Sequence, residues 1–234
     1  MLAGAIDIAV HSLKDLPTEA PKGLSIAAIP EREDPRDAIA GSRLRNLPHG
    51  ARVGTSSGRR AAQLRILRPD LRIEPIRGNV DTRIRKLKEG DYGAIVLAAA
   101  GLRRLGLDSE IAEVLAPEQM CPAPGQGALA IQTRENGPAR EICAQLNHQP
   151  SSQAVACERA ALAALGGGCQ LPIGALAEIF EESLRLLGVV ISPDGSHHLQ
   201  ASAIGPRSRP EELGRSVADQ LLAKGADKIL AASR

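Results

Sequence analysis

The chain has 234 residues, with 29 Lys and Arg against 27 Asp and Glu and a formal net charge of +2. A net charge this small does not indicate a nucleic-acid binder, and the chain has no Trp, one Tyr and one Phe, so it lacks the stacking platforms of single-strand readers. No apolar stretch is long enough for a signal sequence or a membrane span, so the four cysteines are expected to be reduced thiols of a cytoplasmic protein.

The first part of the chain predicts two short strands and a hinge. Apolar residues alternate over 6–10, which is typical of a strand ending at His11-Ser12. A second short strand is expected over 24–29. The stretch 31–37 is charged and interrupted by a proline, so it predicts a linker or hinge.

The next segment has the pattern of a βαβαβ unit. Continuous apolar strands that alternate with helices argue for a parallel sheet covered on both faces. The expected elements are a strand end at 52–55, a helix over 57–67, a strand over 71–76, a helix over 80–89 and a strand over 94–100.

Arginines follow each of these three strands, in 55–60, 77–79 and 101–104. Ligands of such sheets collect at the carboxyl ends of the strands, and the first end adds three hydroxyls at a helix N-terminus, which favours anions. From 52 to 88 there are eleven Arg or Lys against three acids. The pattern predicts a site for a small molecule with several carboxylates or phosphates; a solvated helix face is the alternative.

The last third predicts a small α+β unit. A cluster of helix breakers at 122–128 leads into a strand over 129–132, and a helix ends at Leu165. Strands over 184–191 and 197–204 flank a turn and predict an antiparallel hairpin, whose His197 and His198 are expected at the surface. The final helix starts near Pro210 and is expected to bury Leu213, Val217 and Leu221 and to stop at 224–225.

One cysteine lies in a glycine loop, Gly166-Gly167-Gly168-Cys169. The three glycines leave the thiol uncrowded, so it could carry a bulky group. The alternative is a glycine run that ends a helix before a core cysteine. Cys143 and Cys157 lie in helical patterns and are expected in the core, and no Cys or His spacing indicates a metal site.

Several segments together closely resemble the porphobilinogen deaminase (hydroxymethylbilane synthase) family. The resemblance runs in unbroken order from Ala5 to the C-terminus and is carried by segments 7–15, 31–38, 53–60, 77–80, 99–107, 125–128 and 166–174.

The resemblance implies an α/β fold of two doubly wound, binding-protein-like domains, the first incomplete here, and a small α+β C-terminal domain. The implied boundaries are 1–32 with 122–147, 33–121 and 148–234. Family members carry several dozen residues before this point. The sequence is therefore expected to be either a fragment or a shortened homologue, and the chain as given is expected to be a poor catalyst.

The implied activity is that of a transferase of porphyrin and haem biosynthesis. It links four porphobilinogen units into hydroxymethylbilane, with release of ammonia, on a covalent dipyrromethane cofactor. Cys169 matches the thioether attachment position and Asp15 the catalytic carboxylate. Arg59, Arg60, Arg77, Arg83 and Arg104 match positions that pair with pyrrole carboxylates, with polar contacts from Ser12, Lys14, Thr55, Ser56, Ser57, Gly78 and Asn79. Gln126 matches a position near the cofactor, with a packing role as the alternative.

Five other arginines, Arg65, Arg68, Arg72, Arg85 and Arg103, are expected to be solvated charges. The implied protein is a monomer that uses no metal, membrane or nucleic acid. Two alternatives to an active enzyme are an inactive fragment and an organic-anion binding or sensing protein, for which the basic strand ends would suffice. A basic nucleic-acid module is a further alternative and predicts binding that weakens steeply with salt.

Overall fold

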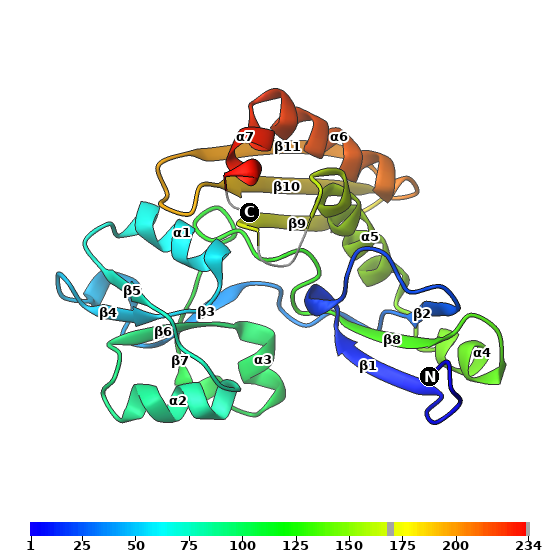
Figure 1. Cartoon of the computed structure of the whole chain (residues 1–234), viewed down its shortest axis with the longest axis horizontal. Coiled ribbons are helices and arrows are strands. Elements are labelled where there is room, and N and C mark those ends of the chain that lie inside the picture. Colours follow the sequence, from blue (N-terminus) through cyan, green and yellow to red (C-terminus); the bar gives the residue numbers. More distant parts are fainter. Residues whose placement is uncertain (168–170, 233–234) are drawn as a thin grey trace.

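The computed structural model describes residues 1–167 and 171–232 and contains three β-sheets. Figure 1 shows a five-stranded sheet on the left, the sheet of β1, β2 and β8 on the right, and the C-terminal sheet above both. Within the described ranges, no helix is long and apolar enough to cross a membrane.

The five-stranded sheet has the order β5-β4-β6-β3-β7. β4 is parallel to β5 and to β6, so the predicted βαβαβ unit is confirmed. Two strands that the sequence analysis did not predict, β3 and β7, extend the sheet in antiparallel fashion and make it mixed. Its elements are β3 (Asp37–Gly41), β4 (Arg52–Gly54), α1 (Gly58–Leu67), β5 (Arg72–Glu74), α2 (Val80–Lys88), β6 (Ala94–Ala98), α3 (Ala99–Arg104) and β7 (Ile111–Val114), with short 3₁₀ turns at Leu44–Asn46 and Asp108–Glu110.

A second sheet takes its strands from two distant parts of the chain. Its order is β1-β8-β2, with both pairings antiparallel, from β1 (Ile8–Ser12), β2 (Leu24–Ala28) and β8 (Leu129–Arg134). β1 lies two residues later than predicted. One face packs on α4 (Pro138–Ala144) through Cys143, and the other packs on Val155 of the following helix.

The C-terminal sheet has the order β11-β10-β9, from β9 (Ile173–Phe180), β10 (Ser183–Ile191) and β11 (His198–Pro206). The predicted hairpin of β10 and β11 is confirmed, whereas β9 was not predicted. Helices α5 (Gln149–Ala164), α6 (Pro210–Ala223) and α7 (Ala226–Ala231) contribute to the core on one face, which includes Leu213, Val217 and Leu221 as predicted.

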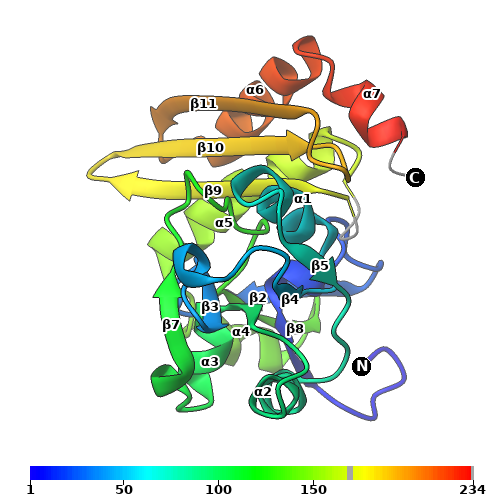
Figure 2. The ribbon, with the colours of Figure 1, turned by 90° about the vertical axis from the view of Figure 1, so that its left-hand side faces the viewer.

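The other face of this sheet contacts α1. Ala62 of α1 packs in one cluster with Leu187, Val189 and Ile191 of β10, and Figure 2 shows α1 directly beneath the strands. Arg65 also donates to the carbonyl of Pro193 at 2.7 Å. α1 is therefore shared between the five-stranded sheet and the C-terminal sheet.

Two irregular segments, 29–36 and 121–128, connect the second sheet to the five-stranded sheet; we call them the crossing segments. They run against each other and are tied directly. The amide of Glu33 donates to the carbonyl of Gly127 at 3.2 Å, and Gln126 Nε2 donates to the carbonyl of Pro35 at 2.7 Å. The predicted hinge is thus irregular chain up to residue 36, and Asp37 belongs to β3.

A buried carboxylate on α5, Glu158, holds both crossing segments. It is 0% exposed and accepts both Nη groups of Arg32, at 2.7 and 3.0 Å. It also accepts the amide of Gly125 at 2.7 Å and that of Ala177 on β9 at 2.9 Å. One side chain therefore joins β9 of the C-terminal sheet to both segments that connect the other two sheets.

The contact between the crossing segments predicts a large effect for Gly127→Ala. Gly127 has a φ of +84°, and a Cβ there would lie 2.3 Å from the carbonyl oxygen of Glu33. Gly90→Ala is a matched control, because its φ is +85° with nothing within 4 Å of the added Cβ. Both variants carry the left-handed strain of about 1–2 kcal/mol, and Gly127→Ala should lose about 1–3 kcal/mol more from the steric clash. Urea unfolding of both proteins measures the difference, and equal losses would contradict the close contact.

Candidate active site

A cavity of about 470 Å³ opens where the three sheets meet. Its walls come from the end of β1, from the first turn of α1, from the second crossing segment and from the beginning of β9. The lining residues are Lys14, Asp15, Ser56, Ser57, Gly58, Arg59, Arg60, Ala123, Pro124, Gln126, Leu162, Leu171 and Ile173. Lysine, arginine and hydroxyl groups predominate among the polar ones, so the cavity suits a ligand with several carboxylates.

Lys14 and Asp15 reach the cavity because the chain turns sharply after β1. A single 3₁₀ turn, Leu13–Asp15, follows the strand. Leu13 is fully buried, and its amide donates to the carbonyl of Ala128 at 3.0 Å. With Leu13 anchored in the core, the next two side chains stand at the cavity wall, and Asp15 is exposed there.

The hydroxyls before α1 have structural partners. Ser57 caps the helix by accepting the amide of Arg60 at 3.4 Å, and Thr55 Oγ1 accepts the amide of Ser57 at 3.2 Å. Ser56 Oγ donates to the carbonyl of Ile76 at 2.7 Å and so links β4 to the end of β5. Of the three hydroxyls expected at this helix N-terminus, those of Ser56 and Ser57 line the cavity.

Arg59 and Arg60, expected to be available to ligand carboxylates, are buried and paired with an acid of the protein. Asp37, at the start of β3, is 0% exposed. Its Oδ2 accepts Arg59 Nη1 at 2.7 Å, and its Oδ1 accepts Arg60 Nε at 2.9 Å and Gln126 Nε2 at 2.9 Å. The sequence analysis missed Asp37, because it closes the charged run 31–37 and nothing local separates it from the acids of a solvated linker.

The electrostatics of the cavity follow from these contacts. Burial by itself would raise the pKa of Asp37, but Arg59 and Arg60 hold it down at about 2. Burial, and then the charge of Arg60, lower the pKa of Lys14 from 10.5 to about 8. Lys14 is cationic below that pH and neutral above it, so the positive charge of the cavity decreases as the pH rises through about 8.

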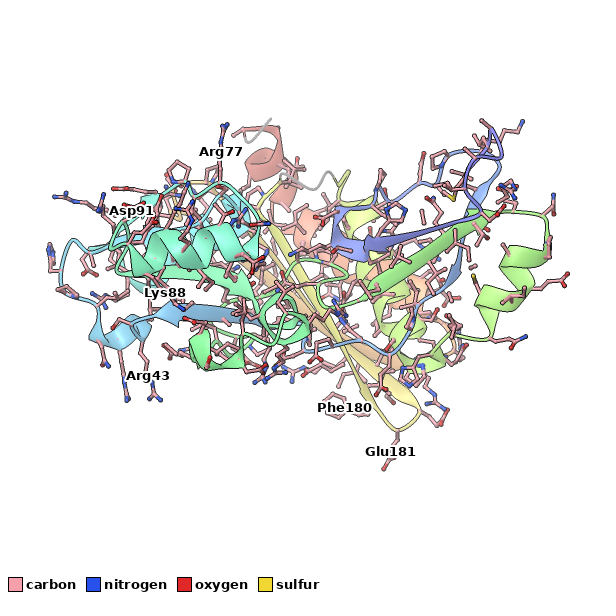
Figure 3. All side chains as sticks on the ribbon, turned by 90° about the horizontal axis from the view of Figure 1, so that it is seen from below. Arg43, Arg77, Lys88, Asp91, Phe180 and Glu181 are labelled. Atoms are coloured by element: carbon pink, nitrogen blue, oxygen red, sulfur yellow. The ribbon has the colours of Figure 1, made fainter. Side chains whose placement is uncertain are left out.

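Seven residues expected at the site lie outside the walls of this cavity among the described residues: Ser12, Thr55, Arg77, Gly78, Asn79, Arg83 and Arg104. Asn79 caps α2 by accepting the amide of Thr82 at 3.0 Å. Arg83 donates to the carbonyl of Gly78 at 2.8 Å, and Arg104 reaches the second crossing segment, donating to the carbonyl of Gly127 at 2.7 Å. Arg77 is exposed and points away from the ribbon in Figure 3.

Two arginines expected to be solvated charges are anchored instead. Arg68 pairs with Asp70 at 2.7 Å and donates to the carbonyls of Leu44 and Leu47. Arg103 pairs with Glu33 and Asp34 of the first crossing segment, each at 3.1 Å. Both assignments were wrong, because the partners lie far away in the sequence or across a turn that periodicity does not reveal.

Cys169 lies outside the described residues. Leu171, separated from it by one residue, lines the cavity. The other three cysteines, Cys121, Cys143 and Cys157, are at most 3% exposed. Burial raises the pKa of the Cys121 thiol, and it raises the pKa of Cys157 to about 12. These two thiols are therefore unreactive at neutral pH.

Comparison with known proteins gives a consistent result over nearly the whole chain. Residues 1–141 match the family model "Porphobilinogen deaminase, dipyromethane cofactor binding domain", and residues 152–223 match "Porphobilinogen deaminase, C-terminal domain". The porphobilinogen deaminase of Thermus thermophilus is 53% identical over 100% of this chain and 79% of its own length. Those of Acidothermus cellulolyticus and Nitrosomonas europaea are 50% and 51% identical, over 100% and 98% of this chain and 73% and 76% of their own lengths.

Proposed function

Because the chain belongs to the porphobilinogen deaminase family, we infer that it joins four porphobilinogen units head to tail into hydroxymethylbilane, with release of ammonia. The observation that carries this inference is the cavity at the junction of the three sheets. It combines one exposed carboxylate, Asp15, with three cationic side chains, Lys14, Arg59 and Arg60. Porphobilinogen has the complementary chemistry, with two carboxylates and a pyrrole N–H.

The cavity fits the dipyrromethane cofactor named by the matching family model. Arg59 Nε and Nη2 have no hydrogen-bond partner among the described residues, although this arginine is 4% exposed and lines the cavity. Two such N–H donors on one edge of a guanidinium are suited to hydrogen-bonding a carboxylate. Arg59, Arg60, Lys14 and Ser57 would hold the acidic side chains, with Cys169 as the attachment point. When bound, the cofactor supplies the terminal pyrrole carbon to which the first unit is added.

We assign Asp15 to the chemical step. Loss of ammonia and formation of the new bond place positive charge on a pyrrole nitrogen. A fixed carboxylate that accepts the pyrrole N–H stabilises this charge more in the transition state than in the ground state. The buried Leu13 anchors the turn that presents Asp15, so the carboxylate is held in place before the reaction begins. It can also accept the ring proton that is lost at the end of each addition.

The arginines outside the cavity fit a later stage of the reaction. Each added unit brings two carboxylates, so the product becomes more anionic as it grows. Arg83 and Arg104 stand beyond the cavity, and Arg77 is exposed. We propose that these three side chains, with Ser12, Thr55, Gly78 and Asn79, contact units further along the chain, while Gln126 braces the cofactor end.

The proposed domain division is 1–32 with 122–147, 33–121 and 148–234. It is supported by the three sheets, since each segment or pair of segments contributes the strands of one sheet. With the crossing segments as hinges, the first two domains would close on the ligand. We propose a monomer that works in the cytoplasm, where free thiols such as those of Cys121, Cys143 and Cys157 stay reduced.

Product analysis tests the proposed function directly. Purified protein is incubated with porphobilinogen, and hydroxymethylbilane and ammonia are quantified together. One hydroxymethylbilane for every four ammonia is expected. Stoichiometric binding of porphobilinogen without release of ammonia would instead support an organic-anion binding protein.

Asp15→Asn should greatly reduce turnover while leaving the protein folded. The change keeps the shape of the side chain and removes the charge that faces the cationic pyrrole. The kcat should fall about 10²–10³-fold, the range seen when one electrostatic contact to a transition state is lost. Glu19→Gln, at an exposed acid four residues further on, is the control and should keep full activity. Near-normal kcat for Asp15→Asn at saturating porphobilinogen would make Asp15 a structural residue.

A further inference from the structure

We propose that Asp37 is the positioning residue of the carboxylate site: it holds Arg59 so that the free edge of its guanidinium faces the cavity. This inference rests on the proposed function, because it gives Asp37 a task toward the carboxylates of the cofactor and of the substrate. Asp37 itself does not line the cavity among the described residues. It therefore acts through the arginines and not on the ligand.

The placement of Asp37 explains how two neighbouring guanidiniums can be buried. Arg59 and Arg60 are adjacent on the first turn of α1 and are 4% and 5% exposed. Two cations so close repel each other, and burial removes most of the screening by water. Asp37 divides its carboxylate between them, with Oδ2 accepting from Arg59 and Oδ1 from Arg60. The three groups together retain one positive charge, which remains available to an anion.

The two arginines differ in how many of their side-chain nitrogens are hydrogen-bonded within the protein. Arg60 uses all its nitrogens within the protein: Nε on Asp37, Nη1 on the carbonyl of Val96 and Nη2 on Gln126 Oε1. Arg59 uses only Nη1, which donates to Asp37 and to the carbonyl of Cys121. Its Nε and Nη2 form the flat edge that binds a carboxylate through two parallel hydrogen bonds. Arg59 is thus the hydrogen-bond donor to a ligand carboxylate, and Arg60 contributes positive charge to the site.

Asp37 also connects this site to the hinge. Gln126 of the second crossing segment donates to Asp37 Oδ1 at 2.9 Å and to the carbonyl of Pro35 in the first crossing segment at 2.7 Å. The direction of Arg59 is therefore fixed relative to both crossing segments. A carboxylate bound to Arg59 meets a donor whose position is set by the hinge and not by α1 alone.

Asp37→Asn tests this proposal, with Asp70→Asn as the matched control. Asp70 accepts Arg68 Nε and Nη2 at 2.7 Å beyond the other end of α1, away from the cavity. The probes are benzene-1,2,4,5-tetracarboxylate, whose affinity is measured by calorimetry on the cofactor-free Cys169→Ser protein with and without each change, and porphobilinogen, whose KM and kcat are measured separately on the cofactor-loaded protein. Asp37→Asn should weaken tetracarboxylate binding about ten- to hundredfold and raise KM more than it lowers kcat. Asp70→Asn should change neither by more than about twofold.

Whether Asp37→Asn weakens or tightens tetracarboxylate binding distinguishes a positioning role of Asp37 from an effect of net charge alone. Removing an anion beside a cationic cavity makes the cavity more positive, so net charge alone predicts tighter binding of the tetracarboxylate. Positioning predicts weaker binding. Unchanged or tighter binding by folded Asp37→Asn would overturn the proposal.

A second pair of variants keeps the test decisive if Asp37→Asn does not fold. Arg60→Gln is compared with the double variant Arg60→Gln/Asp37→Asn. Of Asp37, Arg59 and Arg60, the double variant keeps only the charge of Arg59. Its net charge therefore equals that of the wild type, in which Asp37 offsets one of the two arginines. The double variant should bind the tetracarboxylate more weakly than Arg60→Gln despite its extra positive charge, and equal or tighter binding would overturn the proposal. Asp37-dependent binding by a protein that makes no hydroxymethylbilane would support the positioning role and refute the proposed function.

Discussion

Cys169→Ser should abolish both the covalent adduct and the activity. A hydroxyl is far less nucleophilic than a thiolate, so the thioether to dipyrromethane cannot form in its place. Intact-mass measurement of the wild-type protein should show one adduct of dipyrromethane mass, and peptide mapping should assign it to the segment that contains Cys169. The variant should show the mass of the bare polypeptide and no formation of hydroxymethylbilane.

The other cysteines provide the controls for this experiment. Cys121, Cys143 and Cys157 are at most 3% exposed and lie in the packed cores. A bulky group on any of them would have to displace core side chains. Cys143→Ser and Cys157→Ser should therefore keep the adduct, although they lose some stability because a polar group is buried. An adduct that survives Cys169→Ser, or that maps to one of the other three cysteines, would contradict the assignment.

Glu158→Gln should cause a large loss of folding stability. Gln has the same shape but no charge, so Arg32 is left as a cation without its partner. The amide NH2 of Gln also faces a donor in either orientation: the amide of Ala177 where it replaces Oε1, or the amide of Gly125 where it replaces Oε2. Breaking a buried ion pair on one side costs about 3–5 kcal/mol, which is a large share of the stability of a typical domain.

The exposed pair of Glu182 and Arg207 is the matched control for Glu158→Gln. It is also a two-point pair, with Arg207 Nε and Nη2 at 3.0 and 2.6 Å from the carboxylate oxygens, but Glu182 is 83% exposed. Glu182→Gln should cost at most about 1 kcal/mol, because water screens the pair and replaces the lost contacts. Urea midpoints of the two variants against the wild type give the comparison. Similar losses for both would show that Glu158 does not join the sheets in solution.

The fold could be predicted where local pattern dominates. The strands and helices between residues 52 and 98 and the β10–β11 hairpin were predicted because continuous apolar runs and turn residues determine them locally. β3, β7 and β9 were missed for different reasons. β3 is a short run of small residues that directly follows the charged linker, β9 contains Gly and Ala, which are weak strand formers, and β7 pairs with the distant β3. Pairing partners far along the chain leave no mark in a local window.

For the candidate site, too, some residues could be assigned from the sequence, whereas the environment of others depends on distant partners. Lys14, Asp15 and the residues that begin α1 were assigned through the family resemblance, and the structure places them around one cavity. The burial of Arg59 and Arg60 could not be foreseen, because it depends on Asp37, which is 22 and 23 residues away in the sequence. Glu158 was missed for the same reason, as its partners come from three distant segments. Charge in a sequence indicates which groups are present, whereas only the fold shows which of them neutralise one another.

The paired crossing segments limit the way in which the two sheets that they connect can move. A single flexible linker would allow bending about two axes and twisting about a third. Two linkers side by side, joined between Glu33 and Gly127 and between Gln126 and Pro35, resist twisting and sideways bending, so one rotation remains easy. Under the proposed function, such a joint would let the cavity walls separate for each new pyrrole unit and return to the same alignment, so that the reacting atoms would meet in the same geometry at every round.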